Sequence, residues 1–488
     1  MKDLQRLYTA GQVRELDRLS IEAHGIPGYE LMNRAGQAAF DRLRTRWPEA
    51  RALTIVCGGG NNGGDGYVIA RLARDAGLAV QLIALTAPGQ LAGDASRAAR
   101  DWLDSGGRIE PPEERLRGDV IVDALLGTGL DRPVEGDWAR MIGHINDSPA
   151  PVLAIDIPSG LGADTGRVMG CCVQAAMTVT FIGNKRGLWT AQAANQCGER
   201  CFEGLETPAE IHQVIKADSL LLTDDWGAGC FRSRLPDTHK GDLGHVLVLG
   251  GNNGMLGAAV LAGQAALRTG SGLVSLATRQ QHAALAVTVQ PELMSHGVEY
   301  LSALEGLIAR ADVLALGPGL GQSTWSCTLW QQAVEAGKPL VVDADGLNLL
   351  ASRRERAQNW VLTPHPGEAA RLLAQTVDEV QSDRFAAARR LARQYQATVV
   401  LKGQGSLVCA PDGEVAVCSR GNPAMATAGM GDVLTGMIAS LIGQGHEPFE
   451  AARLGVWLHA RAGDLAARGR RQILASDLLS RLAEALPA

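Results

Sequence analysis

"VCGGGNNGGDGYVIA", residues 56–70, joins an apolar run to a helix-like stretch through six glycines, two asparagines and one aspartate. This order of strand, glycine-rich turn and helix is typical of α/β folds that bind phosphate at a helix N-terminus. Within it, "GGGNNG" at 58–63 fits the G-x-G-x-x-G pattern of dinucleotide-binding loops. A tight turn that only packs a helix on a strand fits the same letters, so the motif alone leaves both interpretations open.

The segments around this loop alternate between strand-like and helix-like patterns. Continuous apolar runs predict buried parallel strands, covered on both faces, at 52–58, 79–86, 119–127, 151–160 and 175–183. The pattern therefore predicts a Rossmann-like doubly wound α/β domain over residues 1–222. The run at 79–86 ends without the acidic residue that holds ribose in ordinary dinucleotide folds, so we expect the loop to bind phosphate in a different manner.

A second glycine loop, "VLVLGGNNGMLGAAVLAG" at 246–263, begins another series of strands and helices. Beyond "GGNN" the two halves share no ordered motif, so the sequence indicates two domains and no internal repeat. A chain of 488 residues is too long for one ordinary core, which agrees with a second α/β domain over residues 223–488.

The bulk composition limits the partners and the compartment. The net charge of −6 argues against nucleic acid, and there is no apolar run of about 18 residues to span a membrane. The charged N-terminus lacks the apolar core of a signal peptide, and the nine cysteines show no zinc-ligand spacing. We expect a cytoplasmic homo-oligomer that binds small molecules, without nucleic acid or membrane.

Polar side chains follow several predicted strands of the first domain. Asn62, Asp123 and Ser159 can meet, because the carboxyl ends of parallel strands meet at one edge of a sheet. One carboxylate among neutral oxygens suits a large monovalent cation better than Mg²⁺ or Ca²⁺. Asp156 lies beside them. A single strand-end aspartate often only caps a helix, but the set of motifs favours a site.

The sharpest motif of the second domain is "ATAGMGDVLTG" at 426–436, which resembles the GxGD element of ribokinase-like enzymes. The backbone N–H groups of Gly429 and Gly431 begin a helix, where they form an anion hole for a transferring phosphoryl group. Asp432 at its edge is placed to accept a proton from a substrate hydroxyl. No P-loop motif occurs in the chain.

Further strand-end motifs of this domain contribute candidate ligands. "LKGQGS" at 401–406 offers Lys402 to a nucleotide, and "TPHPGEAARLL" at 363–373 places His365 in a rigid loop. "LGPGLG" at 316–321 and "VVDADGLNLL" at 341–350 close the same crevice. A lone histidine is more often structural, and the glycines of these loops also serve packing.

The first domain resembles the NAD(P)H-hydrate epimerase family, the YjeF N-terminal domain, through "NNGGDG", "DALLGTGL" and "AIDIPSG" over roughly residues 9–220. The resemblance implies that Asp156 handles the proton at the reacting carbon. It implies K⁺ ligands at Asn62, Asp123 and Ser159. The implied contacts of the hydrated dinucleotide are Asp156 and the two loops Asn61, Asn62, Gly63, Gly64, Asp65 and Gly127, Thr128, Gly129, Leu130, Asp131, Arg132, Pro133.

The second domain resembles the NAD(P)H-hydrate dehydratase family over about residues 238–440, with Ala428 where that family often has proline. The resemblance implies a ribokinase-like fold that uses Mg²⁺ with ADP, and Asp432 as the catalytic base. It implies hydrate contacts at Ala258, Gly319, His365 and Asp432. The implied nucleotide contacts are Lys402, Gly403, Gln404, Gly405, Ser406 and Gly431.

These two resemblances predict repair of hydrated NADH and NADPH. The first domain would interconvert the R and S hydrates, and the second would dehydrate the S hydrate and yield NAD(P)H, AMP and phosphate. The alternative is a ribokinase-like vitamin or sugar kinase fused to a non-catalytic dinucleotide-binding module, because hydroxyl phosphorylation is common to all enzymes with the GxGD element.

Overall fold

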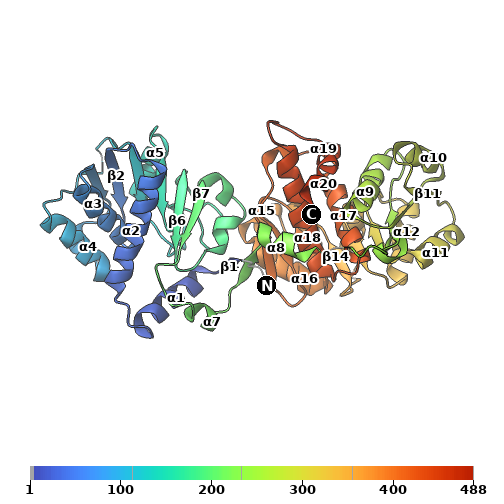
Figure 1. The fold of residues 1–488 in the computed structure, drawn as a ribbon, viewed down its shortest axis with the longest axis horizontal. Coiled ribbons are helices and arrows are strands. Elements are labelled where there is room, and N and C mark those ends of the chain that lie inside the picture. Colours follow the sequence, from blue (N-terminus) through green and yellow to red (C-terminus); the bar gives the residue numbers. More distant parts are fainter. Residues whose placement is uncertain (1–4, 113, 232–233, 354, 487–488) are drawn as a thin grey trace. The chain divides into compact units, whose positions relative to one another are not determined.

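The computed structural model describes residues 5–112, 114–231, 234–353 and 355–486. The chain divides into two compact units, one spanning Arg6–Ser219 and the other spanning Leu220–Ala488 together with the start of the chain. In the part of the chain that is described, none of the helices is both long and apolar enough to cross a bilayer. Each unit is an α/β body built on its own sheet (Figure 1).

The first unit is built on a six-stranded parallel sheet in the order β3-β2-β4-β5-β6-β7, among the residues described. Its strands are β2 (Ala52–Cys57), β3 (Ala79–Ala84), β4 (Val120–Ala124), β5 (Val152–Ile155), β6 (Met177–Phe181) and β7 (Glu199–Glu203). Its helices are α1 (Ala10–Glu22), α2 (Gly28–Arg46), α3 (Asn61–Asp75), α4 (Gly93–Asp104), α5 (Gly136–Asn146), α6 (Ala193–Gln196) and α7 (Ile211–Val214), with 3-10 turns η1 (Pro88–Gln90) and η2 (Arg186–Trp189).

Helices cover both faces of this sheet, as the apolar strands require. α2, α3 and α4 pack with one set of strand side chains, and α5 packs with the other, through Met141, Ile142 and Ile145. α1 begins with a capping box in which Thr9 accepts the N–H of Gln12. The chain passes directly from β2 through the glycine loop into α3. The doubly wound prediction for this part of the chain is confirmed.

The second unit is built on an eleven-stranded mixed sheet, counted over the described residues, in the order β1-β8-β17-β16-β15-β14-β13-β12-β9-β10-β11. Its strands are β1 (Gln5–Leu7), β8 (Ser219–Leu221), β9 (His245–Leu249), β10 (Leu273–Thr278), β11 (Met294–Gly297), β12 (Val313–Leu316), β13 (Leu340–Val342), β14 (Trp360–Leu362), β15 (Thr398–Leu401), β16 (Ser406–Cys409) and β17 (Val415–Cys418). β16 is antiparallel to both of its neighbours, and β8 is parallel to β17.

The helices of the second unit cover this sheet. They are α8 (Asp224–Cys230), α9 (Leu256–Thr269), α10 (Gln280–Val289), α11 (Leu301–Arg310), α12 (Thr324–Glu335), α13 (Asp345–Ala351), α14 (Pro366–Leu373), α15 (Val377–Ser382), α16 (Arg384–Tyr395), α17 (Met430–Gly443), α18 (Pro448–Ala466), α19 (Ala475–Ser480) and α20 (Leu482–Ala485), with 3-10 turns η3 (Lys240–Leu243) and η4 (Pro423–Met425). α9, α17 and α18 form one continuous apolar core with the central strands. α17 is apolar almost all round because it is buried at the centre of this core.

Candidate functional site

The first unit contains a cavity of about 640 Å³ at the carboxyl ends of its strands. Its lining includes Asn61, Asn62, Asp65 and Asp156, together with loop residues 127–132. Pro133, which was predicted with them, is exposed outside the lining. The cavity thus brings together three chain segments that are separate in the sequence and were each predicted from it.

Asn62, Asp123 and Ser159 form a buried polar cluster around the backbone of Leu126. Both Asp123 oxygens accept from Ser159, Oδ1 from its hydroxyl at 2.6 Å and Oδ2 from its N–H at 2.8 Å. Asn62 donates from Nδ2 to the carbonyl oxygen of Leu126 at 3.1 Å. Burial is the main cause that raises the pKa of Asp123 to about 6.

One atom of this cluster is left over. Asn62 Oδ1 is buried, and no group among the described residues donates a hydrogen bond to it. Buried polar oxygens almost always have a partner, so a bound ion or water is the ordinary explanation for such an atom. An amide oxygen, a hydroxyl and one carboxylate fit a monovalent cation, so the ligand types and the charge of these residues suit the expected K⁺.

Asp156 follows β5 in an unusual backbone conformation, with a φ of 67°. The left-handed region is tolerated by Asp and Asn far better than by bulky residues. Its carboxylate makes an ion pair with Lys185, whose ammonium also donates to Thr180 Oγ1 at 2.9 Å and to the carbonyl oxygen of Phe181 at 3.2 Å. Both residues line the cavity, and the carboxylate is the more exposed of the two, at 18% against 1% for Lys185.

Two further carboxyl groups, Asp17 and Asp65, lie near the Asp156–Lys185 pair and line the same cavity. Burial raises the pKa of Asp17 to about 6, against the attraction of Lys185. Burial and then the charge of Asp156 raise the pKa of Asp65 well above its usual value. A site in which three carboxyl groups face one ammonium can hold a proton near neutral pH and is suited to proton transfer.

The glycines of the first loop have two separate roles. A Cβ on Gly58 would lie 1.8 Å from the carbonyl oxygen of Leu125, and one on Gly63 would lie 2.1 Å from that of Gly58. A Cβ on Gly64 would overlap the Met32 side chain. These three glycines let α3 pack closely, whereas Gly60 and Gly129 have open space beside them. The first N–H groups of a helix have no partner within it, so those at the start of α3 are available to an anion.

In the second unit a buried ion pair lies at the carboxyl ends of β13 and β15. Lys402 Nζ is 2.7 Å from Asp343 Oδ1, and Thr435 donates to Asp343 Oδ2 at 2.9 Å. Burial alone would raise the pKa of Asp343, but Lys402 reverses this effect, and the pKa lies below its usual value. The lysine that the sequence assigned to the nucleotide is therefore held in place by a carboxylate.

α17 begins directly beside this pair. Its N-cap, Gly429, has a φ of +91°, and a Cβ on Gly431 would lie 3.2 Å from Lys402 Nζ. The N–H groups of Met430, Gly431 and Asp432 form the first turn of a 14-residue helix, which makes a local anion site. Burial, followed by the charge of Asp343, raises the pKa of Asp432 to about 7. A carboxylate with this pKa is suited to act as a general base near neutral pH.

His365 caps α14 on the neighbouring strand end. Its Nδ1 accepts the N–H groups of Gly367 at 2.9 Å and Glu368 at 3.3 Å, and Pro366 is the first helical residue. Burial and the charge of Lys402 lower the pKa of His365. Because Nδ1 accepts two backbone N–H groups, the proton of the neutral ring lies on Nε2. His365 has the structural role expected of a lone histidine; its side chain is half-exposed, and Nε2 lies 3.4 Å from Glu368 Oε1.

The loop of residues 402–406 turns between β15 and the antiparallel β16. Gly403 and Gly405 have φ values of +133° and +61°, which only glycine adopts easily. Ser406 donates to the carbonyl oxygen of Gly403 at 2.9 Å. Arg384, which is 1% exposed, stabilises the start of the loop by donating to the carbonyl oxygens of Leu401 and Lys402. Gln404, in the same loop, is exposed to solvent.

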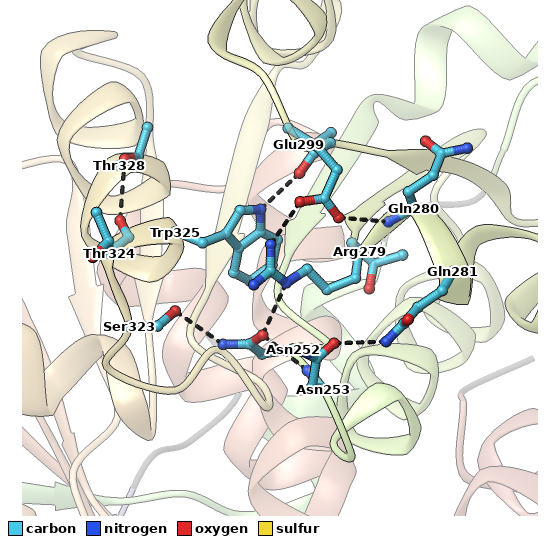
Figure 2. A network of polar contacts seen from close by, with 12 residues as sticks. Asn252, Asn253, Arg279, Gln280, Gln281, Glu299, Ser323, Thr324, Trp325 and Thr328 are labelled. Atoms are coloured by element: carbon cyan, nitrogen blue, oxygen red, sulfur yellow. Dashed lines mark hydrogen bonds and ion pairs between the residues drawn. The ribbon is translucent and has the colours of Figure 1, made fainter.

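Two other glycine loops, residues 250–254 and 317–321, meet at the carboxyl ends of β9 and β12. Gly251 and Asn252 donate to the carbonyl oxygens of Pro318 and Gly319 at 3.0 and 2.7 Å. A Cβ on Gly319 would lie 3.3 Å from the Cβ of Ala258, so the two predicted hydrate contacts are neighbours. Figure 2 shows the polar network that surrounds Asn252 at this junction.

Sequence reasoning missed several residues of both sites. Asp17 and Lys185 were not singled out, although "NKRG" at 184–187 follows a predicted strand and this position was a usable signal. Asp343 and Glu368 were quoted inside motifs without a role. Arg384 gave no local signal, because its importance comes only from burial beneath the loop of residues 402–406.

Known proteins match the chain along its whole length. Residues 246–487 match the family model described as NAD(P)H-hydrate dehydratase, and residues 28–187 match the one described as YjeF-related protein N-terminus. The bifunctional NAD(P)H-hydrate repair enzyme Nnr of Coxiella burnetii is 46% identical over 98% of both chains.

Solved structures match the second unit. A crystal structure of ADP/ATP-dependent NAD(P)H-hydrate dehydratase from Bacillus subtilis, with ATP/Mg²⁺, is 31% identical with a TM-score of 0.50 and covers 54% of this chain and 96% of that one. A ribokinase-like superfamily protein from Enterococcus faecalis is 26% identical with a TM-score of 0.52 and covers 55% of this chain and 96% of its own. The ribokinase-like prediction for the second part of the chain is confirmed.

Proposed function

The chain belongs to the family of bifunctional NAD(P)H-hydrate repair enzymes, and from this premise we propose how its two sites divide the repair. The protein combines an NAD(P)H-hydrate epimerase with a nucleotide-dependent NAD(P)H-hydrate dehydratase. We assign epimerisation to residues 1–222 and dehydration to residues 223–488. The observation that supports the assignment is that each unit has its own cluster of carboxyl groups with a lysine, one around Asp156 and one around Asp432.

In the proposed dehydratase reaction, Asp432 takes the proton of the hydrate's hydroxyl group while that oxygen attacks the terminal phosphorus of ADP. AMP leaves with the bridging oxygen, and the N–H groups at the start of α17 and the ammonium of Lys402 stabilise the charge on the transferred phosphoryl group. Phosphate then leaves the ring carbon with its electron pair, assisted by the ring nitrogen. Loss of a proton from the adjacent carbon restores NAD(P)H.

Ala258, Gly319 and His365 are proposed to hold the S hydrate, and residues 402–406 with Gly431 to hold ADP. The close approach of Gly431 to Lys402 supports the nucleotide assignment, because any side chain at 431 would occupy the space beside the ammonium. Mg²⁺ is proposed to arrive with the nucleotide phosphates, which it usually binds together with few protein ligands. The homo-oligomer expected from the sequence stays a prediction.

The dehydratase rate should depend on pH through Asp432. A base must be ionised to accept a proton, so activity is present above its pKa and is lost below it. With the pKa of Asp432 raised to about 7, we expect kcat/KM to fall about tenfold per pH unit below that value. The check is kcat/KM for the S hydrate between pH 5.5 and 9 under saturating ADP. A flat profile through pH 7 would contradict the assignment.

In the proposed epimerase reaction, Asp156 moves a proton at the hydrated ring while Lys185 holds the carboxylate in place. Ring opening or enamine–iminium exchange inverts the hydroxylated carbon. The pyrophosphate is proposed to bind at the start of α3, and Asp65 and residues 127–132 to complete the walls. Asn62, Asp123 and Ser159 would hold K⁺, which supplies positive charge near the pyrophosphate when it is bound.

Epimerisation should therefore depend on the monovalent cation. We expect a faster R/S exchange in potassium buffer than in sodium buffer, and the slowest in a bulky organic cation, because only a large bare cation suits this ligand set. Asp123→Ala should remove most of this dependence and weaken substrate binding. The measurement is exchange between the two hydrate signals by NMR.

A matched control is available at the opposite end of the same strand. Asp119 precedes β4 and accepts the N–H groups of Arg51 and Ala52 at 2.8 and 2.9 Å. Asp119→Ala removes a carboxylate from the far edge of the sheet and should leave the cation dependence intact. Equal exchange rates of the wild type in all three buffers would exclude the cation site.

A further inference from the structure

Arg279 follows β10 and is fixed on three sides. Its Nε donates to Asn252 Oδ1 at 3.1 Å, and its Nη1 is 2.7 Å from Glu299 Oε2. Its guanidinium carbon lies 4.7 Å from the ring centroid of Trp325 (Figure 2). Trp325 is itself fixed, because its indole N–H donates to the carbonyl oxygen of Val298 at 2.6 Å. A planar guanidinium held in this way is a donor of fixed direction.

The acceptor, Asn252, joins the two glycine loops at residues 250–254 and 317–321. Its side chain is 8% exposed, and Nδ2 donates to the carbonyl oxygen of Leu320 at 3.0 Å and to Ser323 Oγ at 3.2 Å. The amide has one acceptor atom and one donor group on opposite sides. Arg279 can only donate, and together with the N–H of Asn253, which donates to Oδ1 at 2.8 Å, it directs the oxygen side of the amide away from Leu320.

We propose that Arg279 is a positioning residue for the dehydratase, which acts through Asn252 to hold the two loops that receive the hydrated ring. The inference rests on the proposed assignment of Ala258 and Gly319 to the hydrate. These two residues are neighbours only because the loops approach closely: a Cβ on Gly319 would lie 2.4 Å from the carbonyl oxygen of Met255. A slight separation of the loops would therefore change the hydrate pocket.

The effect should be confined to one substrate. Arg279 and Asn252 follow β10 and β9, whereas the proposed nucleotide loop follows β15, and three strands separate β9 from β15 in the sheet. Lys402 is held by the side chain of Asp343, which neither Arg279 nor Asn252 contacts. Loss of Arg279 should thus weaken hydrate binding and leave nucleotide binding unchanged.

The test uses the full-length protein and purified S hydrate with ADP. Arg279→Met keeps an unbranched side chain against Trp325 and removes every donor. We expect KM for the hydrate to rise about 10-fold, in keeping with a lost hydrogen bond from a charged group, with KM for ADP within about twofold of wild type. Arg279→Lys keeps a charge for Glu299 without the forked donor, and should also raise KM for the hydrate.

Arg453→Met is the matched control. Arg453 also pairs with a glutamate, Glu414 at 3.7 Å, and lies over two aromatic rings, those of Trp226 and Phe449. Like Arg279, it packs against aromatic rings and lies beside a glutamate, but it does not contact the glycine loops. We expect the KM values of this variant for the hydrate and for ADP to match those of the wild type. This result would show that losing an arginine packed on aromatic rings does not by itself raise KM for the hydrate.

A double-mutant cycle identifies the route of the effect. If Arg279 acts through Asn252, the Arg279→Met/Asn252→Ala variant should have the hydrate KM of Asn252→Ala alone. Independent, multiplying effects would overturn the inference, as would a wild-type hydrate KM in Arg279→Met or Arg279→Lys. If either result is found, the proposed function still stands, provided that the wild type is active and the Asp432→Asn variant is not. A wild type without dehydratase activity would remove the proposed function itself.

Discussion

Asp432→Asn should reduce the dehydratase rate by about 10²- to 10⁴-fold, the usual contribution of a general base. The substitution keeps the size of the side chain at the start of α17 and removes the group that accepts the proton. ADP affinity should be preserved or slightly improved, because one of the acidic groups near the phosphate site becomes neutral. The measurement is a single-turnover rate of NAD(P)H formation from the S hydrate at saturating ADP.

A second acid in the same unit provides the control for this variant. Asp345 lies near Asp432 and accepts the N–H of Gly321 at 2.8 Å; Asp345→Asn removes its charge but keeps an amide oxygen that can accept this N–H. It should retain most of the rate. An Asp432→Asn enzyme that forms NAD(P)H within a factor of three of the wild type would show that another group accepts the proton.

Asp156→Asn should abolish epimerisation and leave dehydration of the S hydrate intact. Asparagine suits this position because it also tolerates the left-handed backbone of residue 156, where alanine would add strain. The variant leaves Lys185 buried beside a neutral amide, so some loss of stability is expected together with the loss of activity. With an R/S mixture, the full-length variant should convert the S hydrate and then stop.

The stalled reaction is the decisive readout, because it separates the two sites within one molecule. Addition of the Asp432→Asn protein, whose epimerase site is unchanged, should restart it. Asp94→Asn removes a different carboxylate of the same cavity and should convert the whole mixture. Complete conversion by Asp156→Asn, faster than spontaneous epimerisation, would place the epimerase chemistry at another residue.

Much of both sites was predictable because parallel strands bring their carboxyl ends to one edge. Asn62, Asp123 and Ser159 could be grouped from strand ends alone, and they contact or adjoin one another around Leu126. Asp432 was predictable because a glycine pair before an apolar helix indicates a buried helix start. In each of these cases the local pattern and the strand order determine the position of the side chain.

The rest depends on packing that no local pattern encodes. Asp17 of α1 lines the same cavity as Asp156, and nothing in the helical pattern of α1 indicates that placement. The polar edge strand β7 and the short strands β1, β8 and β11 were not predicted, because they lack the apolar runs that indicated buried strands elsewhere. The raised pKa of Asp432 arises from burial beside Asp343, which follows a different strand.

The strand β8 has a practical consequence for anyone who wishes to separate the two activities by truncation. Leu220 and Leu221 are paired with Ala416 and Val417 of β17, so a fragment that begins at residue 225 loses this strand. The edge of β17 would then present unpaired N–H and C=O groups to solvent, and such an edge promotes aggregation through pairing between molecules. A truncation before Ser219 retains the strand and keeps that edge covered.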